Sequence, residues 1–347
     1  MGLFKKVLWA ITVVLFVGCS QSGNNNKQNT QQKKKWAIVL HGGAGVISKD
    51  MPDSVKQAYR NDLDHALTIG EKMLKNGDAA IDVVEHVINY MEDNPKFNAG
   101  KGAVFTHDGE HELDAGIMIG NTRQAGTITG VKTVKNPISL ARLVMEKSKH
   151  VMFAGAGAEA FADKMGVERV NQKYFYTERR YKQWKRALKE DNKDVQSSNL
   201  PPKDPAVFYD YDKFGTVGCV VLDQNGQLVA GTSTGGLTDK MYGRVGDVPT
   251  VGAGTYASDV VAVSMTGIGE KIMEAVSGHT VSAYMKYKPA SLKEAGNYLI
   301  NDVLDSGVAG MIAVDKYGNT YMNMNTQGMF RATSDSKGNR KVAIWEE

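Results

Sequence analysis

The stretch GTVGCVVLD, residues 215–223, decides how the chain is interpreted. After its first glycine and threonine it is apolar enough to form a buried strand. The threonine at its head has two explanations. Threonine is β-branched and suits strands. Alternatively, Thr216 is a nucleophile that becomes reactive only after the bond preceding it is cut.

The second explanation has a chemical basis. A threonine hydroxyl needs a base beside it, and cutting the chain before Thr216 would free an α-amine that titrates near pH ~8, against ~10.4 for a lysine. Gly215 has no side chain to clash when the peptide bond is bent. A glycine and threonine before a strand are common, however, and alone they favour ordinary strand propensity.

The beginning of the chain is typical of an exported protein. Lys5 and Lys6 precede an apolar run over residues 7–17, which is too short to span a bilayer, and Cys19 follows. Residues 1–18 resemble a bacterial lipoprotein signal, which predicts a lipid on Cys19 and a location in the periplasm or cell envelope. Phe16 departs from the small aliphatic residue usual at its position, so secretion without a lipid stays open. Residues 19–35 are polar and predict a disordered tether.

The composition indicates a globular protein, with 42% hydrophobic and 23% charged residues among 347. Six lysines and no acids in residues 1–35 account for the basic character, so the net charge of +4 becomes −2 for residues 36–347. Nothing therefore favours nucleic acid as a partner. With Cys19 lipidated, Cys219 has no disulfide partner and is expected to be an inert core residue.

Residues 36–347 are expected to form one large domain, because about 310 residues is near the upper size of a single core. Helices are predicted over 54–75, from a cap at Asp78 onward, and over 139–165, 269–276 and 291–304. Strands are predicted over 36–40, 102–106, 112–119, 125–134, 216–223, 227–232, 260–266, 311–315 and 320–324. Strands, then helices, then strands, twice over, favour two stacked sheets flanked by helices. No regular pattern is found between Gln172 and Phe214, which predicts a flexible linker.

Five motifs in order carry a resemblance. They are HGGAG (41–45), NPKFNAGKGAVFT (94–106), HELDAGIMIGNT (111–122), the run from GTSTGG to MTGIGE (231–270), and MNTQGMFRA (324–332). Together they resemble the plant-type L-asparaginase and isoaspartyl peptidase family of N-terminal-nucleophile hydrolases. The resemblance spans Trp36 to Ala332 apart from the 172–214 segment. It implies a four-layer αββα sandwich, cut by itself into parts 36–215 and 216–347 that stay together, in an (αβ)₂ assembly.

The resemblance also implies roles for residues around the cut. Gly215–Thr216 would be the self-cleavage bond, and Thr216 would be the nucleophile and, through its new amine, the base. Thr234 would hydrogen-bond to Thr216, whereas outside the family its hydroxyl would be assigned to a turn cap. Asn98 matches a family position near the active site, which implies a role in substrate binding.

Substrate and oxyanion sites follow in the same way. Arg244 and Asp247 would hold the α-carboxylate and α-ammonium of the substrate, which suits the zwitterionic end of an amino acid. The ordinary alternative is a solvated ion pair. Thr266, through its hydroxyl, and Gly267, through its N–H, would form the oxyanion hole. Thr266 could instead cap a helix.

No cofactor is expected to be required. The loop 91–101 resembles one that holds a structural Na⁺ or K⁺ through backbone carbonyls, which would come from Met91, Glu92, Asn94, Phe97, Ala99 and Lys101. HGGAG lacks the pattern of a phosphate-binding loop. His107 and His111 flank Asp108-Gly109, which predicts a hairpin turn between strands rather than a metal site.

The implied activity is hydrolysis of L-asparagine and β-aspartyl (isoaspartyl) dipeptides. A glycosylasparaginase shares the nucleophile and stays open as an alternative, although STGG stands where STNG is expected in that branch. A surface binding lipoprotein that kept the fold and lost the chemistry is the third alternative.

Overall fold

The computed structural model describes residues 35–195 and 215–346, without the side chains of residues 190–195. The predicted signal peptide and nearly all of the predicted tether lie outside these residues. In the described ranges no helix is both long and apolar enough to span a membrane.

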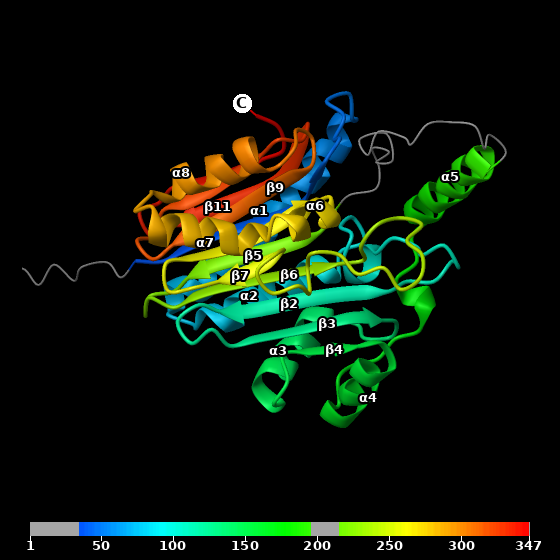
Figure 1. Cartoon of the computed structure of the whole chain (residues 1–347), viewed down its shortest axis with the longest axis horizontal. Coiled ribbons are helices and arrows are strands. Elements are labelled where there is room, and N and C mark those ends of the chain that lie inside the picture. Colours follow the sequence, from blue (N-terminus) through cyan, green and yellow to red (C-terminus); the bar gives the residue numbers. More distant parts are fainter. Residues whose placement is uncertain (1–34, 196–214, 347) are drawn as a thin grey trace, which may run out of the picture. The chain divides into compact units, whose positions relative to one another are not determined.

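Two β-sheets form the centre (Figure 1). The larger sheet has the order β12-β11-β1-β5-β6-β2-β3-β4 and is antiparallel except for the β3–β4 pair. Its strands are β1 (Ala37–Gly45), β2 (Leu113–Ile119), β3 (Ala125–Val131), β4 (Met152–Ala154), β5 (Val217–Leu222), β6 (Leu228–Thr234), β11 (Gly328–Asp335) and β12 (Arg340–Ala343). The smaller, antiparallel sheet has the order β10-β9-β8-β7, with β7 (Thr255–Ala257), β8 (Val261–Gly267), β9 (Ala309–Asp315) and β10 (Thr320–Met324).

Helices cover the outer face of each sheet (Figure 1). On the larger sheet these are α1 (Asp53–Asn76), α2 (Ala80–Glu92), α3 (Pro137–Lys147) and α4 (Gly155–Met165). On the smaller sheet they are α6 (Gly269–Glu274), α7 (Ser277–Tyr287) and α8 (Leu292–Asn297), which continues as a π-helical turn over Tyr298–Val303. Short 3₁₀ turns occupy Gly100–Gly102 and Gln172–Tyr174, and α5 spans Glu178–Val195.

Three apolar clusters separate the four layers. In β5, Val217, Cys219 and Val221 pack with the helices over the larger sheet, whereas Val220 and Leu222 pack between the two sheets. Side chains alternate across a strand, so a strand covered on both faces must be apolar throughout. A third cluster lies between the smaller sheet and its helices. The predicted αββα sandwich is confirmed.

Three strand connections use the same turn. Asp223, Asp315 and Asp335 each accept hydrogen bonds from the backbone N–H groups two and four residues later, at 2.8–3.1 Å. The glycine three residues after each aspartate has a φ between +79° and +95°, which only glycine adopts readily. The pattern Asp-x-x-Gly therefore encodes these tight turns locally.

The predicted cap of the second helix was wrong. The helix begins at Ala80, and no side chain caps it through its N-cap residue Ala79. The Ala80 N–H instead donates to Asp223 Oδ2 at 2.9 Å. Asp223 thus closes a turn with one oxygen and a helix N-terminus with the other, a long-range contact that Asp78 does not make.

Other boundaries also differ from expectation. The region 139–165 is two helices separated by β4, and residues 103–106 form no strand but follow the 3₁₀ turn that ends at Gly102. Helix α7 was not predicted, because Gly278, Thr280 and Val281 are poor helix formers. Residues 172–214 were expected to be irregular, which was wrong for the first half, where α5 lies. The remainder, residues 196–214, lies outside the described residues.

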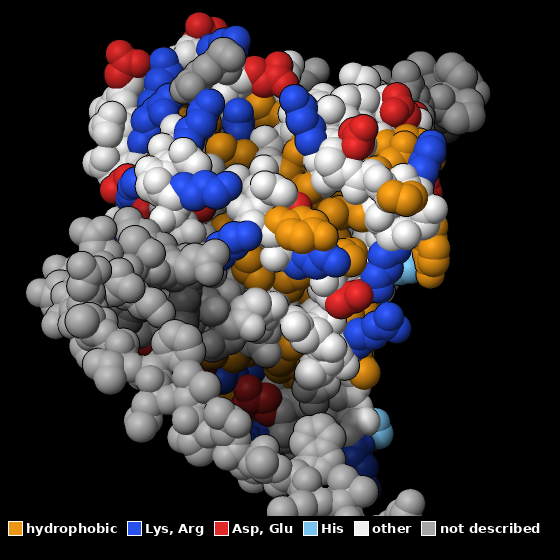
Figure 2. Space-filling view, turned by 90° about the vertical axis from the view of Figure 1, so that its left-hand side faces the viewer, with side chains coloured by type: hydrophobic (Ala, Val, Ile, Leu, Met, Phe, Trp, Pro, Cys, Tyr) orange, Lys and Arg blue, Asp and Glu red, His pale blue; other side chains and the backbone are white. Residues whose placement is uncertain are grey.

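The described surface carries charges of both signs. Figure 2 shows one face on which lysine, arginine and acidic side chains surround an apolar area. Mixed charge gives no long-range field that would favour one class of charged macromolecule.

Asp223→Ala is expected to lower the free energy of unfolding by about 2 kcal/mol, because three backbone N–H groups lose a buried charged acceptor. Urea unfolding of the full chain measures this. Asp78→Ala, which removes the cap proposed from sequence, is the control and should stay within about 0.5 kcal/mol of wild type. Equal losses for both variants would contradict the assignment.

Candidate active site

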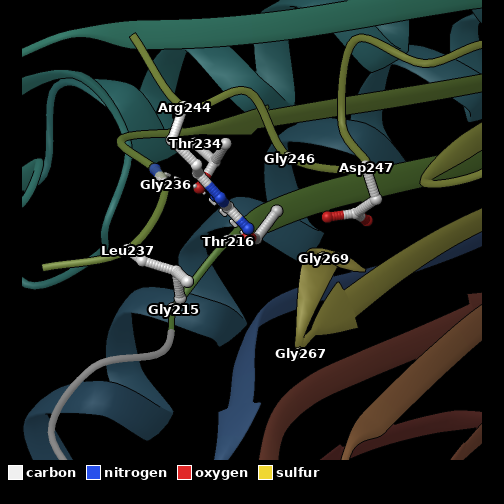
Figure 3. Close-up of a pocket in the computed structure, with 10 residues that line it drawn as sticks. All are labelled: Gly215, Thr216, Thr234, Gly236, Leu237, Arg244, Gly246, Asp247, Gly267 and Gly269. Carbon is white, nitrogen blue, oxygen red and sulfur yellow. Dashed lines mark hydrogen bonds between the residues drawn. The ribbon is translucent and has the colours of Figure 1, made fainter. Parts of the chain in front are cut away.

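Thr216 lies directly before β5 and is buried, with 9% of its surface exposed. Its hydroxyl donates to Thr234 Oγ1 at 3.1 Å (Figure 3). The register between β5 and β6 pairs Val217 with Ser233, which places the two threonines beside each other at the ends of neighbouring strands. The predicted contact between them is therefore present, and it depends on strand register.

The turn after Thr234 is held by Asn98. Thr234 Oγ1 also accepts the Gly236 N–H at 2.9 Å, and Asn98 Nδ2 donates to the Gly236 carbonyl at 2.8 Å. Asn98 Oδ1 in turn accepts the Val104 N–H at 3.0 Å. Asn98 thus orients the partner of Thr216 through the backbone, and it does not itself line the pocket.

His41 lies on the other side of Thr216. Its Nδ1 is 3.0 Å from the Thr216 carbonyl oxygen and its Nε2 is 2.9 Å from Ser264 Oγ. Burial lowers the pKa of His41 to about 3, although the hydrogen bond to Thr216 raises it. The ring is therefore neutral, and because a carbonyl only accepts, Nδ1 donates and Nε2 accepts from Ser264.

A chain of hydroxyls continues from there. Ser264 Oγ is 2.7 Å from Thr232 Oγ1, and since Ser264 donates to His41, Thr232 donates to Ser264. Sequence reasoning missed this network, because the three residues are far apart in the chain and serine and threonine carry no pattern that marks them.

Glycines allow neighbouring segments of the chain to approach one another closely around Thr216. Gly43 has a φ of +111°, and a Cβ placed on it would lie 2.4 Å from Gly215 Cα. A Cβ on Gly218 would lie 2.1 Å from Ser264 Oγ. The Gly43 contact is with backbone and the Gly218 contact is with the buried Ser264 hydroxyl, so both positions need glycine for close approach.

Arg244 and Asp247 point toward Thr216 from different sides of the pocket (Figure 3). Arg244 also binds Glu270, with Nε–Oε1 at 2.8 Å and Nη2–Oε2 at 2.9 Å. Burial raises the pKa of Glu270, but hydrogen bonds from Arg244 outweigh this and leave it below the usual value. Sequence reasoning missed Glu270, which stands at the end of MTGIGE.

Asp247 is an unusual carboxylate. Its Oδ2 is buried and has no hydrogen-bond partner among the described residues. Burial raises its pKa to about 7, although the charge of Arg244 lowers it. A buried acceptor of this kind beside a threonine hydroxyl is suited to bind a cationic group.

Thr266 and Gly267 end strand β8. Thr266 Oγ1 accepts the Ala44 N–H at 3.2 Å. The alternative in which Thr266 caps a helix was wrong, because α6 begins at Gly269 with Ile268 as its N-cap residue. Gly267 lines the pocket with a φ of +141°, and a Cβ on it would lie 2.1 Å from the Val308 carbonyl oxygen.

The pocket is small while the chain is intact. Its cavity is about 10 Å³, which holds about one water molecule. Its lining residues are Gly215, Thr216, Thr234, Gly236, Leu237, Arg244, Gly246, Asp247, Gly267 and Gly269. The structure thus gathers six predicted site residues in one pocket, while Asn98 and Thr266 act from just outside it.

Comparison with known proteins decides the family. The family model described as Asparaginase matches residues 34–344. The chain belongs to the asparaginase family. A probable isoaspartyl peptidase/L-asparaginase 2 of Arabidopsis thaliana is 45% identical over 327 residues, covering 90% of this chain and 99% of that protein. The isoaspartyl peptidase of Escherichia coli K12 is 44% identical over 317 residues, covering 90% and 97%.

A third relative is also similar over most of both chains. The plant-type L-asparaginase of Pyrococcus horikoshii is 40% identical over 305 residues, covering 84% of this chain and 94% of that protein. The asparaginase family match thus spans both parts of the chain and the predicted cut between them.

The loop 91–101 contains backbone carbonyl groups of the kind that could hold an alkali cation. Backbone carbonyls of Glu92, Pro95 and Phe97 crowd the places of Cβ atoms on Gly100 and Gly102, at 2.0–2.7 Å. Carbonyl oxygens are the donors that Na⁺ or K⁺ prefers, and the two glycines leave space beside them. The predicted cation site stays a prediction.

The predicted hairpin at Asp108-Gly109 is a turn, but no strands flank it. Gly109 has a φ of +80° and its N–H donates to the Thr106 carbonyl. His107 Nδ1 contacts Asp239 Oδ1, and His111 Nδ1 contacts the Val104 carbonyl oxygen. In residues 35–195 and 215–346, no group of three or more His, Cys, Asp or Glu side chains is placed to hold a metal ion.

Asp247 gives a prediction for the uncut chain, studied as Thr216→Ala. Its pKa is higher in the folded than in the unfolded state, so folding is favoured at low pH and stability is lost as pH rises from about 4 to about 7. Asp247→Asn in the same background should remove a slope of up to about 1.4 kcal/mol per pH unit in urea unfolding.

Asp259→Asn provides the control. Its carboxylate pairs with Lys286, which lowers its pKa, so its contribution lies at pH values below the tested window. Parallel stability curves for the parent and the Asp247 variant between pH 4 and 7 would contradict the prediction.

Proposed function

We propose that this chain is a self-processing amidohydrolase that cleaves L-asparagine and β-aspartyl dipeptides through Thr216. The observation that carries the proposal is the Thr216–Thr234 hydrogen bond in a pocket shared with Arg244 and Asp247. The names of the relatives, isoaspartyl peptidase and L-asparaginase, support the same substrates.

The first step is self-cleavage. Thr216 Oγ attacks the Gly215 carbonyl carbon, its proton leaves through a neighbouring base, and the C–N bond breaks as the Thr216 nitrogen takes up a proton. Breaking the C–N bond frees the Thr216 amine, and water then hydrolyses the resulting ester, which yields a Gly215 carboxylate and restores the Thr216 hydroxyl. This amine then serves as the base for turnover, because it stands next to its own hydroxyl.

Turnover repeats the same chemistry on substrate. The Thr216 amine accepts the hydroxyl proton while Oγ attacks the side-chain carbonyl of the aspartyl group. The proton passes to the leaving nitrogen, and ammonia or an amino acid departs. Water then attacks the β-aspartyl ester and gives a proton to the amine, which passes it to Thr216 Oγ as the ester C–O bond breaks and aspartate leaves.

Recognition falls to the charged residues. Arg244 binds Glu270 through Nε and Nη2, and its guanidinium, directed toward Thr216 (Figure 3), binds the substrate α-carboxylate. The Asp247 carboxylate, whose Oδ2 is buried without a hydrogen-bond partner among the described residues, binds the α-ammonium. Thr266, whose oxygen already accepts the Ala44 N–H, donates its proton to the oxyanion together with the Gly267 N–H.

The cellular setting belongs to the proposal as well. We propose that residues 1–18 direct export and that Cys19 carries a lipid, which would hold the enzyme at the cell envelope. The cut chains would form an (αβ)₂ assembly that acts on small substrates. These elements rest on the sequence of the chain and on its resemblance to the family.

Thr216→Ala should leave one uncut chain and lower kcat/KM on β-Asp-Leu by roughly 10⁴-fold or more. Wild type should give two bands on a denaturing gel, with a fragment beginning at Thr216 in mass spectrometry. Thr216→Ser keeps a hydroxyl and should still be cut. Wild type that stays uncut and inert would favour the binding-protein alternative, and cleavage of GlcNAc-Asn without dipeptide turnover would favour a glycosylasparaginase.

Glu270→Ala should raise KM for β-Asp-Leu about tenfold and change kcat less than about threefold, because the guanidinium of Arg244 loses the partner that orients it. Glu274→Ala is the matched control, since Glu274 lies on the same helix and contacts Lys271 at the surface. A fall in kcat with constant KM would refute this role.

A further inference from the structure

We infer that Arg180, on the helix α5 that was not predicted, is a positioning residue for the cut between Gly215 and Thr216. The inference rests on the proposed self-cleavage. It concerns the first, intramolecular reaction rather than turnover of substrate.

An aromatic cluster holds α5 against the body of the protein. The Trp184 ring stacks on Phe105 with centroids 5.3 Å apart, and Tyr181 meets Phe105 edge-on at 6.1 Å. A Cβ on Gly109 would lie 2.9 Å from the Trp184 ring, so the turn after Thr106 is shaped to receive it. The start of α5 is therefore fixed in place before the chain reaches Gly215.

Two neighbouring arginines leave α5 in different directions. Arg179 donates to Tyr59 Oη at 3.0 Å and to the Lys96 carbonyl at 2.6 Å. Arg180 is 2% exposed and its Nε donates to the Gly102 carbonyl at 2.8 Å. The two side chains thus hold opposite ends of the 96–102 loop.

Arg180 also lies beside Gly215, the residue that precedes the cut. Its Nη2 lies 3.6 Å from the place of a Cβ on Gly215, and Asn98 Cβ lies 3.2 Å from the same place. The backbone of Gly43 also approaches Gly215 Cα. The guanidinium therefore confines Gly215 directly, and through Gly102 it holds the loop that carries Asn98.

This location gives the charge a role in cleavage. Attack by Thr216 makes the Gly215 carbonyl oxygen negative, and ester hydrolysis turns the same group into a carboxylate. A buried guanidinium next to Gly215 stabilises both charges and restricts the backbone at the reacting bond. Neither effect acts on a substrate that enters after the cut.

The test is a time course of self-cleavage in the full-length chain, followed on denaturing gels. Arg180→Met keeps the stem, loses the charge and the donors, and should slow cleavage at least tenfold. Arg180→Lys keeps a charge and a donor and should recover part of the rate. Arg179→Met, which removes the neighbouring arginine that does not approach Gly215, should cleave within about threefold of wild type.

A second readout separates positioning from folding and from turnover. The loss in cleavage rate for Arg180→Met should exceed its loss in kcat/KM per cut molecule at least tenfold, with thermal unfolding comparable to that of Arg179→Met. Equal slowing by the two methionine variants, or no recovery with lysine, would overturn the inference. Wild type that never cuts would instead defeat the proposed function.

Discussion

The pairing register of β5 with β6 is the constraint on which the site depends. It sets Thr216 against Thr234, and it cannot slip, because a shift of one residue would turn every side chain of β5 to the opposite face. Both faces of β5 are buried, one under helices and one against the second sheet. The four-layer fold therefore serves the site by making one register far more favourable than its neighbours.

The sequence was most informative where the encoding is local. The order of predicted strands and helices indicated two stacked sheets, and the resemblance carried by the five motifs implied the four-layer sandwich and the family. The Asp-x-x-Gly turns could have been read from sequence as well. Contacts across the fold were not accessible in this way: Asp223 rather than Asp78 meets the second helix, and Glu270 meets Arg244. Such pairs depend on tertiary placement, which propensity does not encode.

The high charge of α5, the helix that carries Arg180, prevented its prediction from sequence. In α5 the buried or partly buried positions Tyr181 and Trp184 stand among lysines, arginines and glutamates, so the apolar stripe is thin and the segment reads as a linker. The same dense charge includes an arginine that is buried rather than solvated. The composition of α5 predicts solvated side chains on average, whereas the proposed role in self-cleavage depends on Arg180, which is buried.

The strand order of the larger sheet has a consequence for a chain cut before Thr216. β1 lies between β11 and β5, and β2 pairs with β6, so strands from the two fragments interleave within one sheet. Cys219 is buried, and no cysteine lies between residues 36 and 215 to cross-link the fragments. Once melted, such a protein would consist of two separate molecules whose reassociation is bimolecular. Its persistence in a cell would then be governed by the height of the unfolding barrier rather than by a refolding equilibrium.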